Sequence, residues 1–295
     1  MMFKFPKDEH DGQKPMYAKV DEEYLNKDLK QYLDRYEIRH TSYDKEKRKF
    51  KMSFQNGQVE YCGGVHNFIK KEHIPASARK IKQRRYKTAK RGSSAFIGSK
   101  VDDDVMVYVK ANGKRETREN MYTKALLDFL EKFKYPIQAA QVPVQLPAVG
   151  KITTADLITL DPKGKHLVLF EVKTGYPVLQ RGKYMFPPLN DVNAHRQNEA
   201  HLQVLYTRIG FNFAGLPIKE HYVLRVYQEN DDMKVRLLPP PVWIRSYWKR
   251  AYGLITGTPM PEQKVVIKNE KKKKRKRKRT STRKGNTSKK KKKSK

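Results

Sequence analysis

Two stretches of mostly apolar residues mark neighbouring strands in the middle of the chain. Residues 152–160 and 166–174 are rich in β-branched and aliphatic side chains, a composition typical of strands. Between them, Pro162 and Gly164 favour a tight turn. The pattern therefore predicts an antiparallel hairpin.

The turn fixes which residues of this hairpin face each other. With residues 162–165 as the turn, the numbers of cross-strand partners add up to 327, as those of Asp156 and Glu171 do. Directly opposed residues have Cβ atoms about 4.5–5.5 Å apart, and strand alternation places Lys173 on the face of Glu171. Two carboxylates and an ammonium are thus expected side by side on otherwise apolar strands. Burying charged groups costs free energy unless they are paired or bind a metal, so their presence here indicates a function.

Periodicity predicts the remaining elements. Apolar residues at helical spacing predict helices over residues 21–36, 117–133, 191–208 and 242–254. Short strand-like runs, the first two joined by the strong hairpin turn Asn56-Gly57, cover residues 49–54, 58–62, 141–146, 221–228 and 233–238. Helices that flank a run of strands predict an α/β fold with a mixed sheet between helices.

Composition divides the chain into four segments. Residues 1–69 are expected to form a small N-terminal helix-plus-hairpin unit, and residues 101–258 the main α/β domain. Residues 70–100 crowd Lys and Arg among few large apolar residues, which indicates a basic linker or an arm that orders on phosphates, or else a solvated basic loop. Residues 259–295 form a Lys/Arg-rich tail that is expected to be disordered.

Net charge points to a polyanionic partner. The chain carries 65 Lys+Arg against 31 Asp+Glu, a formal +34, and the 17 Lys/Arg of residues 271–295 supply half of it. A surplus of this size attracts polyanions through counterion release. We expect DNA, or RNA, as the partner; charge by itself leaves an anionic membrane surface open. The tail is also typical of a nuclear localisation signal, which predicts the nucleus, or the host nucleus for a viral protein.

Other features narrow the class further. The single cysteine, Cys62, allows no intrachain disulfide and no cysteine-rich zinc site, and it fits a reducing compartment. No run of about 18 apolar residues exists, so no membrane association is expected. The N-terminus lacks the apolar stretch of a signal peptide. No small-molecule cofactor is expected, and the oligomeric state stays open.

The carboxylates of the hairpin fit a divalent metal. Mg²⁺ takes one or two carboxylates together with waters and substrate phosphate, and we expect Mn²⁺ to substitute. Asp156 and Glu171 would hold the ion, while Lys173 would orient or deprotonate a water and offset phosphate charge. A surface ion pair between Glu171 and Lys173 is the plain alternative. Glu119, which continues the apolar stripe of the helix over residues 117–133, is expected as a further ligand, unless it is a first-turn acid favoured by the helix dipole.

These residues, in this order, resemble the PD-(D/E)XK nuclease superfamily. The match is a helix with Glu119, a strand with Asp156, then Glu171-Val172-Lys173 and a second helix, over roughly residues 115–230. The resemblance implies a restriction-endonuclease-like core of order α-β-β-β-α-β and metal-dependent phosphodiester hydrolysis. Ala155 stands where the family name has Pro, at a position that varies in the superfamily.

The second helix is similar to the Gln- and Tyr-bearing helix of the lambda exonuclease, RecB-type and viral alkaline nuclease branch. In that branch, polar residues of this helix support the metal site and contact the DNA backbone, which implies such roles for Gln203, His195 and Asn198. A structural role is the alternative for His195. Cations interleaved with aromatics, and the basic arm, add the expected nucleic-acid contacts Tyr176, Arg181, Lys183, Lys82, Arg84 and Arg85.

The sequence is compatible with three functions. The favoured one is an Mg²⁺-dependent deoxyribonuclease, an exonuclease by the lambda-like helix, acting in DNA replication, recombination or repair; a DNA-virus origin fits the alkaline-nuclease likeness. A structure-selective endonuclease or a ribonuclease on the same fold is the second. A non-catalytic nucleic-acid-binding or packaging protein, which needs none of the acids, is the third.

Overall fold

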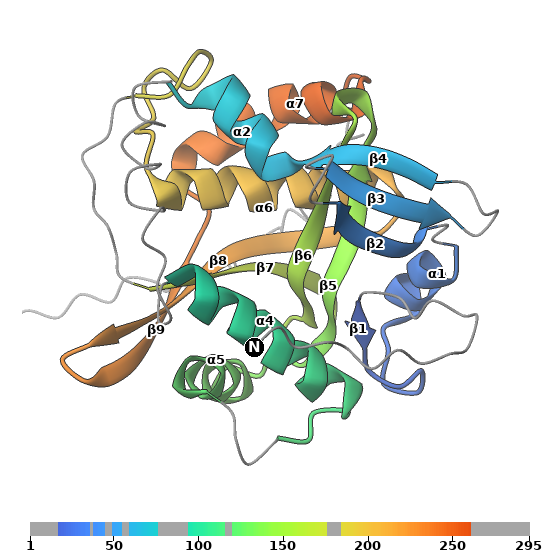
Figure 1. Cartoon of the computed structure of the whole chain (residues 1–295), viewed down its shortest axis with the longest axis vertical. Helices are drawn as coiled ribbons and strands as arrows, with labels where there is room; N and C mark the ends of the chain where they lie inside the picture. Colours follow the sequence, from blue (N-terminus) through green and yellow to red (C-terminus); the bar gives the residue numbers. More distant parts are fainter. Residues whose placement is uncertain are drawn as a thin grey trace, which may run out of the picture. The chain divides into compact units, whose positions relative to one another are not determined.

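A mixed β-sheet with helices on both faces runs through the described part of the chain (Figure 1). The structure is a computed structural model that describes residues 17–35, 38–44, 49–54, 59–75, 94–115, 120–175 and 184–260, with the backbone only for those between 38 and 61 and for 94 and 95. All of them belong to one compact unit, residues 1–260. The expected α/β class, a mixed sheet flanked by helices, is confirmed.

Nine strands of the described residues join in this sheet. Its main path is β2-β3-β4-β6-β7-β8-β9, and β5 pairs with β6 and carries β1 on its other side. The pairs β4/β6 and β7/β8 are parallel and the others antiparallel. The strands are β1 Ala18–Lys19, β2 Ile38–Asp44, β3 Lys49–Phe54, β4 Val59–Gly64, β5 Ile137–Leu146, β6 Lys151–Leu160, β7 Leu167–Thr174, β8 Ile218–Glu229 and β9 Asp232–Leu238.

Two layers of helices bury the two faces of the sheet. The helices are α1 Lys27–Arg35, α2 Val65–His73, α4 Ser94–Lys110, α5 Met121–Lys132, α6 Arg196–Phe213 and α7 Val242–Thr256. Helices α4 and α5 pack on the face that carries Leu157 and Phe170. Helix α6 covers the opposite face, where Ile158 and Leu169 lie, and α2 and α7 pack against α6 (Figure 1). The candidate site lies in a cavity that is lined by strands β6 to β9 and by helices α2, α4 and α6.

Several predicted boundaries were wrong. Helix α5 begins at Met121 and not at residue 117, because the Asn120 side chain caps it by accepting from the Tyr122 and Thr123 N–H groups. Helix α6 covers Arg196–Phe213 in place of residues 191–208, because His195 caps its start. The predicted N-terminal helix is confined to α1. The strands β3 to β9 lie where the sequence predicts them, within a few residues.

Helix α4 begins at Ser94, inside the segment predicted to be a basic linker or arm. Val101, Val105 and Val109 follow one another at a spacing of four and are all buried on the sheet side of the helix. Valine and the intervening run Asp102-Asp103-Asp104 have low intrinsic helix propensity, so packing against the sheet stabilises this helix more than its composition does. Helix α2 and strand β2 were not predicted either. No helix in the ranges given above is long and apolar enough to span a bilayer.

Candidate active site

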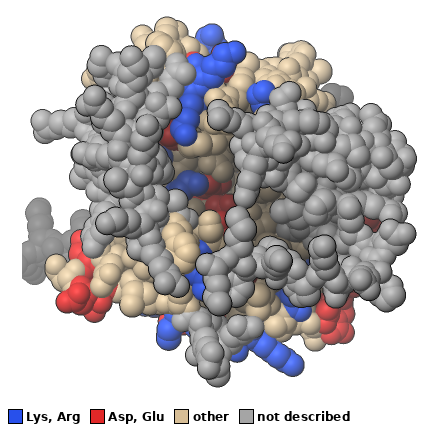
Figure 2. Space-filling model, viewed as in Figure 1, with Lys and Arg blue, Asp and Glu red and all other residues tan. Residues whose placement is uncertain are grey.

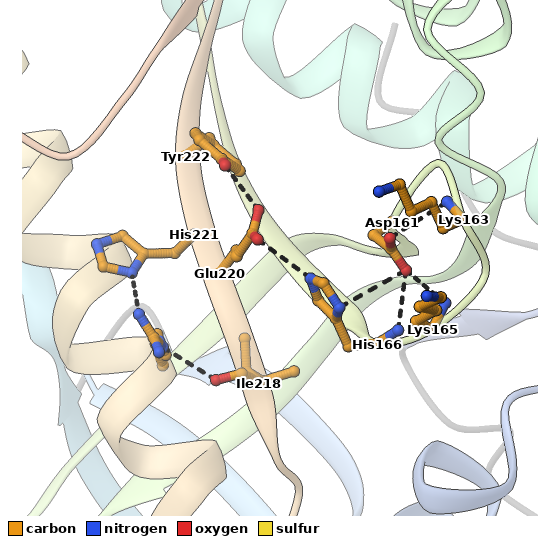
Figure 3. A network of polar contacts seen from close by, with 9 residues as sticks. Asp161, Lys163, Lys165, His166, Ile218, Glu220, His221 and Tyr222 are labelled. Carbon is orange, nitrogen blue, oxygen red and sulfur yellow. Dashed lines mark hydrogen bonds and ion pairs between the residues drawn. The ribbon is translucent and has the colours of Figure 1, made fainter. Parts of the chain in front are cut away.

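The hairpin of β6 and β7 has the predicted register. Leu157 pairs with Phe170, Ile158 with Leu169 and Leu160 with Leu167, so every pair adds up to 327. The turn is held by Asp161, whose carboxylate accepts from the backbone N–H groups of Lys163, Lys165 and His166 at 3.2, 2.5 and 2.9 Å (Figure 3). His166 in turn contacts Glu220 of β8 at 3.2 Å. These contacts fix the turn, and the turn fixes the register.

Asp156 lies one step beyond the last backbone pair of this hairpin. Its Oδ2 accepts the backbone N–H of Val172 at 2.7 Å, so the carboxylate continues the ladder. On its other side Asp156 faces Gln141 of β5, whose Nε2 donates to Oδ1 at 3.5 Å. Gln141 has a φ of 55°, a conformation that a non-glycine residue adopts only when its surroundings impose it. Both neighbouring strands therefore hold the orientation of this carboxylate.

Glu171 and Lys173 project from β7 on the face that carries α6. Glu171 is 1% exposed, and its Oε1 contacts the Lys173 ammonium directly. The Lys173 side chain keeps 44% of its surface exposed, so it reaches from the buried carboxylate toward solvent. Burial would lower the pKa of Lys173, but the charges of Glu171 and Asp156 outweigh it and raise that pKa. The ammonium stays protonated at neutral pH.

A third carboxylate, Asp102, comes from helix α4. Burial, with the charge of Asp156, raises the pKa of Asp102 to about 8. Burial and then the charge of Asp156 also raise the pKa of Glu171 to about 8, although Lys173 opposes the shift. Burial raises the pKa of Asp156 as well. Three carboxyl groups that resist ionisation together form a site that gains from a bound cation.

The three carboxyl groups share one cavity of about 360 Å³ with a fourth, that of the buried Glu199 in α6. Figure 2 shows it as a hollow near the middle of the view, with acidic and basic atoms side by side inside it. Its walls come from strands β6, β7, β8 and β9 and from helices α2, α4 and α6. The ionisable and amide side chains of the lining include Asp102, Asp156, Glu171, Lys173, Arg196, Glu199, Gln203 and Arg225, together with His66 and Lys70 of α2.

The structure separates the three polar residues predicted on the second helix. Gln203 lines the cavity. His195 precedes the helix, and its Nδ1 accepts from the Asn198 N–H at 3.3 Å. The Asn198 side chain is 9% exposed and donates to the Asn193 carbonyl at 2.9 Å. His195 and Asn198 therefore organise the start of α6, and neither is among the lining residues of the cavity.

Several predicted residues lie outside the described part of the chain. They are Glu119, Tyr176, Arg181, Lys183, Lys82, Arg84 and Arg85, and the basic tail lies outside it too. The acids that helices of the described residues bring to the cavity are Asp102 of α4 and Glu199 of α6.

The cavity residues that the sequence did not indicate include Asp102, Arg196, Glu199 and Arg225. Asp102 follows the buried Val101 in α4, so a search for apolar positions four apart in that segment could have indicated it. Arg225 alternates with the buried Leu224 and Val226 in β8, which marks it as a polar-face residue of a strand. No local signal singles out Arg196, since only the fold carries the start of α6 to the cavity.

The donor atoms of the site are carboxylate oxygens, the ligands that Mg²⁺ and Mn²⁺ prefer. Among the described residues, no three His, Cys, Asp or Glu side chains are grouped closely enough to hold one metal ion by themselves. Two carboxylates, Asp156 and Glu171, with waters and a substrate phosphate are the usual set for Mg²⁺. The residues present fit a cation that is shared with a substrate.

Comparison with known proteins assigns no family. No family model matches the chain, and no curated protein matches it. A solved structure described as the crystal structure of SSO0001 is 12% identical, in an alignment that covers 63% of this chain and 88% of that one, with a TM-score of 0.22. A likeness at that level carries no argument about fold or function.

Proposed function

We propose that this chain is a divalent-metal-dependent deoxyribonuclease whose active site is the cavity at the β6–β7 hairpin. The observation that carries the proposal is the set of Asp156, Glu171 and Lys173, which emerge from two paired strands into one cavity, with the carboxyl pKa values raised. The element order α5-β5-β6-β7-α6-β8 is the α-β-β-β-α-β order that the resemblance implies. A net charge of +34 supports a polyanionic substrate.

Each residue has a role that its geometry supports. Asp156 and Glu171 would hold Mg²⁺, or Mn²⁺ in its place, and Asp156 is oriented for this by Val172 and Gln141. A divalent cation bound there would polarise the phosphodiester and lower the pKa of a water. Lys173 keeps its proton and places a positive charge beside the reacting phosphate, where stabilisation of developing negative charge is usually the largest catalytic contribution.

Helix α6 supports the exonuclease version of this proposal. Gln203 lies on the cavity wall, as the lambda exonuclease, RecB-type and viral alkaline nuclease resemblance implies for a residue that assists the site. A structure-selective endonuclease or a ribonuclease would use the same three residues, so substrate choice decides between them. A non-catalytic binding protein would not need buried carboxyl groups with raised pKa values.

A panel of substrates tests the proposal. We expect wild-type protein with Mg²⁺ to degrade linear DNA, to leave closed-circular DNA intact and to lose activity in EDTA. Asp156→Asn keeps an acceptor for the Val172 N–H and should fold but not cleave, whereas Asp34→Asn, at an exposed acid on α1, should cleave like wild type. Cleavage of closed circles would indicate an endonuclease, and cleavage of RNA only a ribonuclease. Equal cleavage by wild type and Asp156→Asn would overturn the catalytic assignment.

A further inference from the structure

A row of three cations crosses the sheet at the mouth of the cavity. Lys173 of β7 pairs with Arg225 of β8, and Arg225 pairs with Arg236 of β9, so the three residues lie abreast on three adjacent strands. Neighbouring strands are about 4.8 Å apart, which gives the row a length of about 10 Å between its end Cα atoms. Each step of the row, about 4.8 Å, is longer than the roughly 3.4 Å rise per phosphate of one duplex strand, which suits the more extended backbone of a single strand.

These cations share the face of the sheet that forms the cavity. The row below them, Glu171, Val223 and Leu238, lines the cavity in the same cross-strand alignment. Paired residues of adjacent strands point to the same side, and residues two apart in one strand do so too. Arg236 is therefore on the cavity face, and it is exposed.

The cations are close enough to influence one another. Burial lowers the pKa of the Arg225 guanidinium, and the positive charges of Arg196 and Arg236 lower it further. Arg225 donates to the Gly175 carbonyl at 3.4 Å, directly after β7. Like charges gathered in this way cost free energy unless an anion offsets them.

The next row on the same face adds an aromatic ring. Tyr227 of β8 pairs with Lys234 of β9, two residues beyond Arg225 and Arg236. Tyr227 is half-buried and Lys234 exposed, and Lys234 lies 3.6 Å from Asp232. The exposed acids Glu229, Asp231 and Asp232 surround the turn that ends this face, where Figure 2 shows acidic atoms at the edge of the view. The surface thus runs from the cavity through cations and one aromatic ring to an acidic end.

We propose that the outer face of the β8–β9 hairpin is a binding track for single-stranded nucleic acid, with Arg225 and Arg236 on consecutive phosphates and Tyr227 stacked on a base. Alternating cations and aromatic rings are the arrangement that single strands prefer, because every base offers a face for stacking. The acids at the hairpin turn end the track after a few nucleotides. The inference rests on the proposed function, because a strand bound on this track would connect with the reacting phosphate beside Lys173.

Salt dependence of binding tests the track without any cleavage. A fluorescein-labelled single-stranded oligonucleotide is titrated with the full chain in EDTA at several salt concentrations. Each phosphate contact contributes about 0.7 to the slope of log K against log salt for a single strand. We expect Arg236→Gln to reduce the slope by about 0.7 and Arg236→Lys to keep it, since the contact depends on charge. The basic tail contributes equally to every variant, so the difference in slope is the readout.

Two further variants separate the parts of the proposal. Tyr227→Leu should weaken single-strand binding by about tenfold, a typical effect of losing one base stack, with an unchanged slope. Arg245→Gln, at an exposed arginine of α7, is the matched control and should behave like wild type. Arg236→Gln with the wild-type slope would overturn the track, and so would Tyr227→Leu with wild-type affinity. Binding is measured in EDTA, so it does not depend on cleavage. If the variants change binding as expected but the wild type does not cut DNA in Mg²⁺, only the nuclease function is refuted. If the wild type cuts DNA but the variants bind as the wild type does, only the track is refuted.

Discussion

Three buried histidines predict a loss of stability as the pH falls. His73, His201 and His221 are 3%, 1% and 2% exposed, and burial lowers their pKa values to about 4, 4 and 3. In the unfolded chain a histidine has a pKa of about 6.5. Since the folded-state pKa is the lower one, the unfolded chain binds protons first. The contribution of the neutral histidines is therefore complete above pH 6.5 and is lost as the pH falls toward 4.

The size of the effect follows from these pKa values. At pH 5 a histidine of the unfolded chain is nearly all protonated, whereas a buried one is nearly all neutral. Each histidine therefore lowers the free energy of unfolding by about 2 kcal/mol between pH 7.5 and pH 5. Three of them cost about 6 kcal/mol together, which is comparable with the whole stability of a typical domain, about 5–15 kcal/mol.

His201→Leu isolates one of these contributions. The Nδ1 atom of His201 is buried and has no hydrogen-bond partner in the described part of the chain, so leucine removes no contact there. We expect the variant to lose about 2 kcal/mol less than wild type between pH 7.5 and pH 5. Urea unfolding, followed by tryptophan fluorescence, would show this as a difference of about 1 M in the midpoint shift, for a slope of about 2 kcal/mol/M.

The comparison with wild type is essential to this test. The raised carboxyl pKa values of Asp102 and Glu171 act in the opposite direction, because these groups stabilise the folded chain as they take up protons below pH 8. They are common to both proteins and cancel in the difference. Equal losses of stability in wild type and His201→Leu would refute the reasoning that His201 is held neutral by burial.

Three more predictions concern the metal, a cap and a close contact. Mg²⁺ or Mn²⁺ at about a hundred times its Kd should stabilise the wild type by about 2.7 kcal/mol in thermal melts. The same ion should stabilise Glu171→Gln far less, and an equal rise in melting temperature would exclude Glu171 as a ligand. Asn120→Ala removes the acceptor of two N–H groups at the start of α5 and should cost about 1 kcal/mol in urea unfolding, so an unchanged midpoint would contradict the cap. Gly210→Ala places a Cβ 2.8 Å from Leu146 Cδ2 and 3.2 Å from the Gln145 carbonyl oxygen; it should cost about 1–3 kcal/mol, and a stabilised variant would contradict the contact.

The hairpin of the site could be predicted because its information is local. Strand alternation and the Pro162–Gly164 turn lie within one stretch of about two dozen residues, and a turn of known length sets the register by itself. The pairing of Leu157 with Phe170 follows from that turn. Local sequence alone therefore predicts that Asp156, Glu171 and Lys173 lie together.

The rest of the cavity depends on contacts between distant segments. Asp102 reaches it only because α4 packs on the sheet through Val101 and Val105, and the low helix propensity of its sequence concealed the helix. Arg225 stands beside Lys173 through a parallel pairing, whose register is set by the whole crossover through α6 and not by a short turn. The role predicted for His195 came from the resemblance of its helix to that of the lambda exonuclease branch, whereas the structure makes His195 the cap of α6.

Single-turnover cleavage at saturating protein tests the central claim most directly. Linear DNA is incubated with an excess of wild type, Asp156→Asn or the control Asp34→Asn, in Mg²⁺ and in EDTA, so that weaker binding cannot lower the rate. The account predicts Mg²⁺-dependent cleavage by wild type and Asp34→Asn, and a rate at least about a hundredfold lower for Asp156→Asn, on the scale of losing one catalytic electrostatic contact. Wild-type protein that binds DNA but does not cut it in Mg²⁺ or Mn²⁺, or an Asp156→Asn variant that cuts at the wild-type rate, would contradict it.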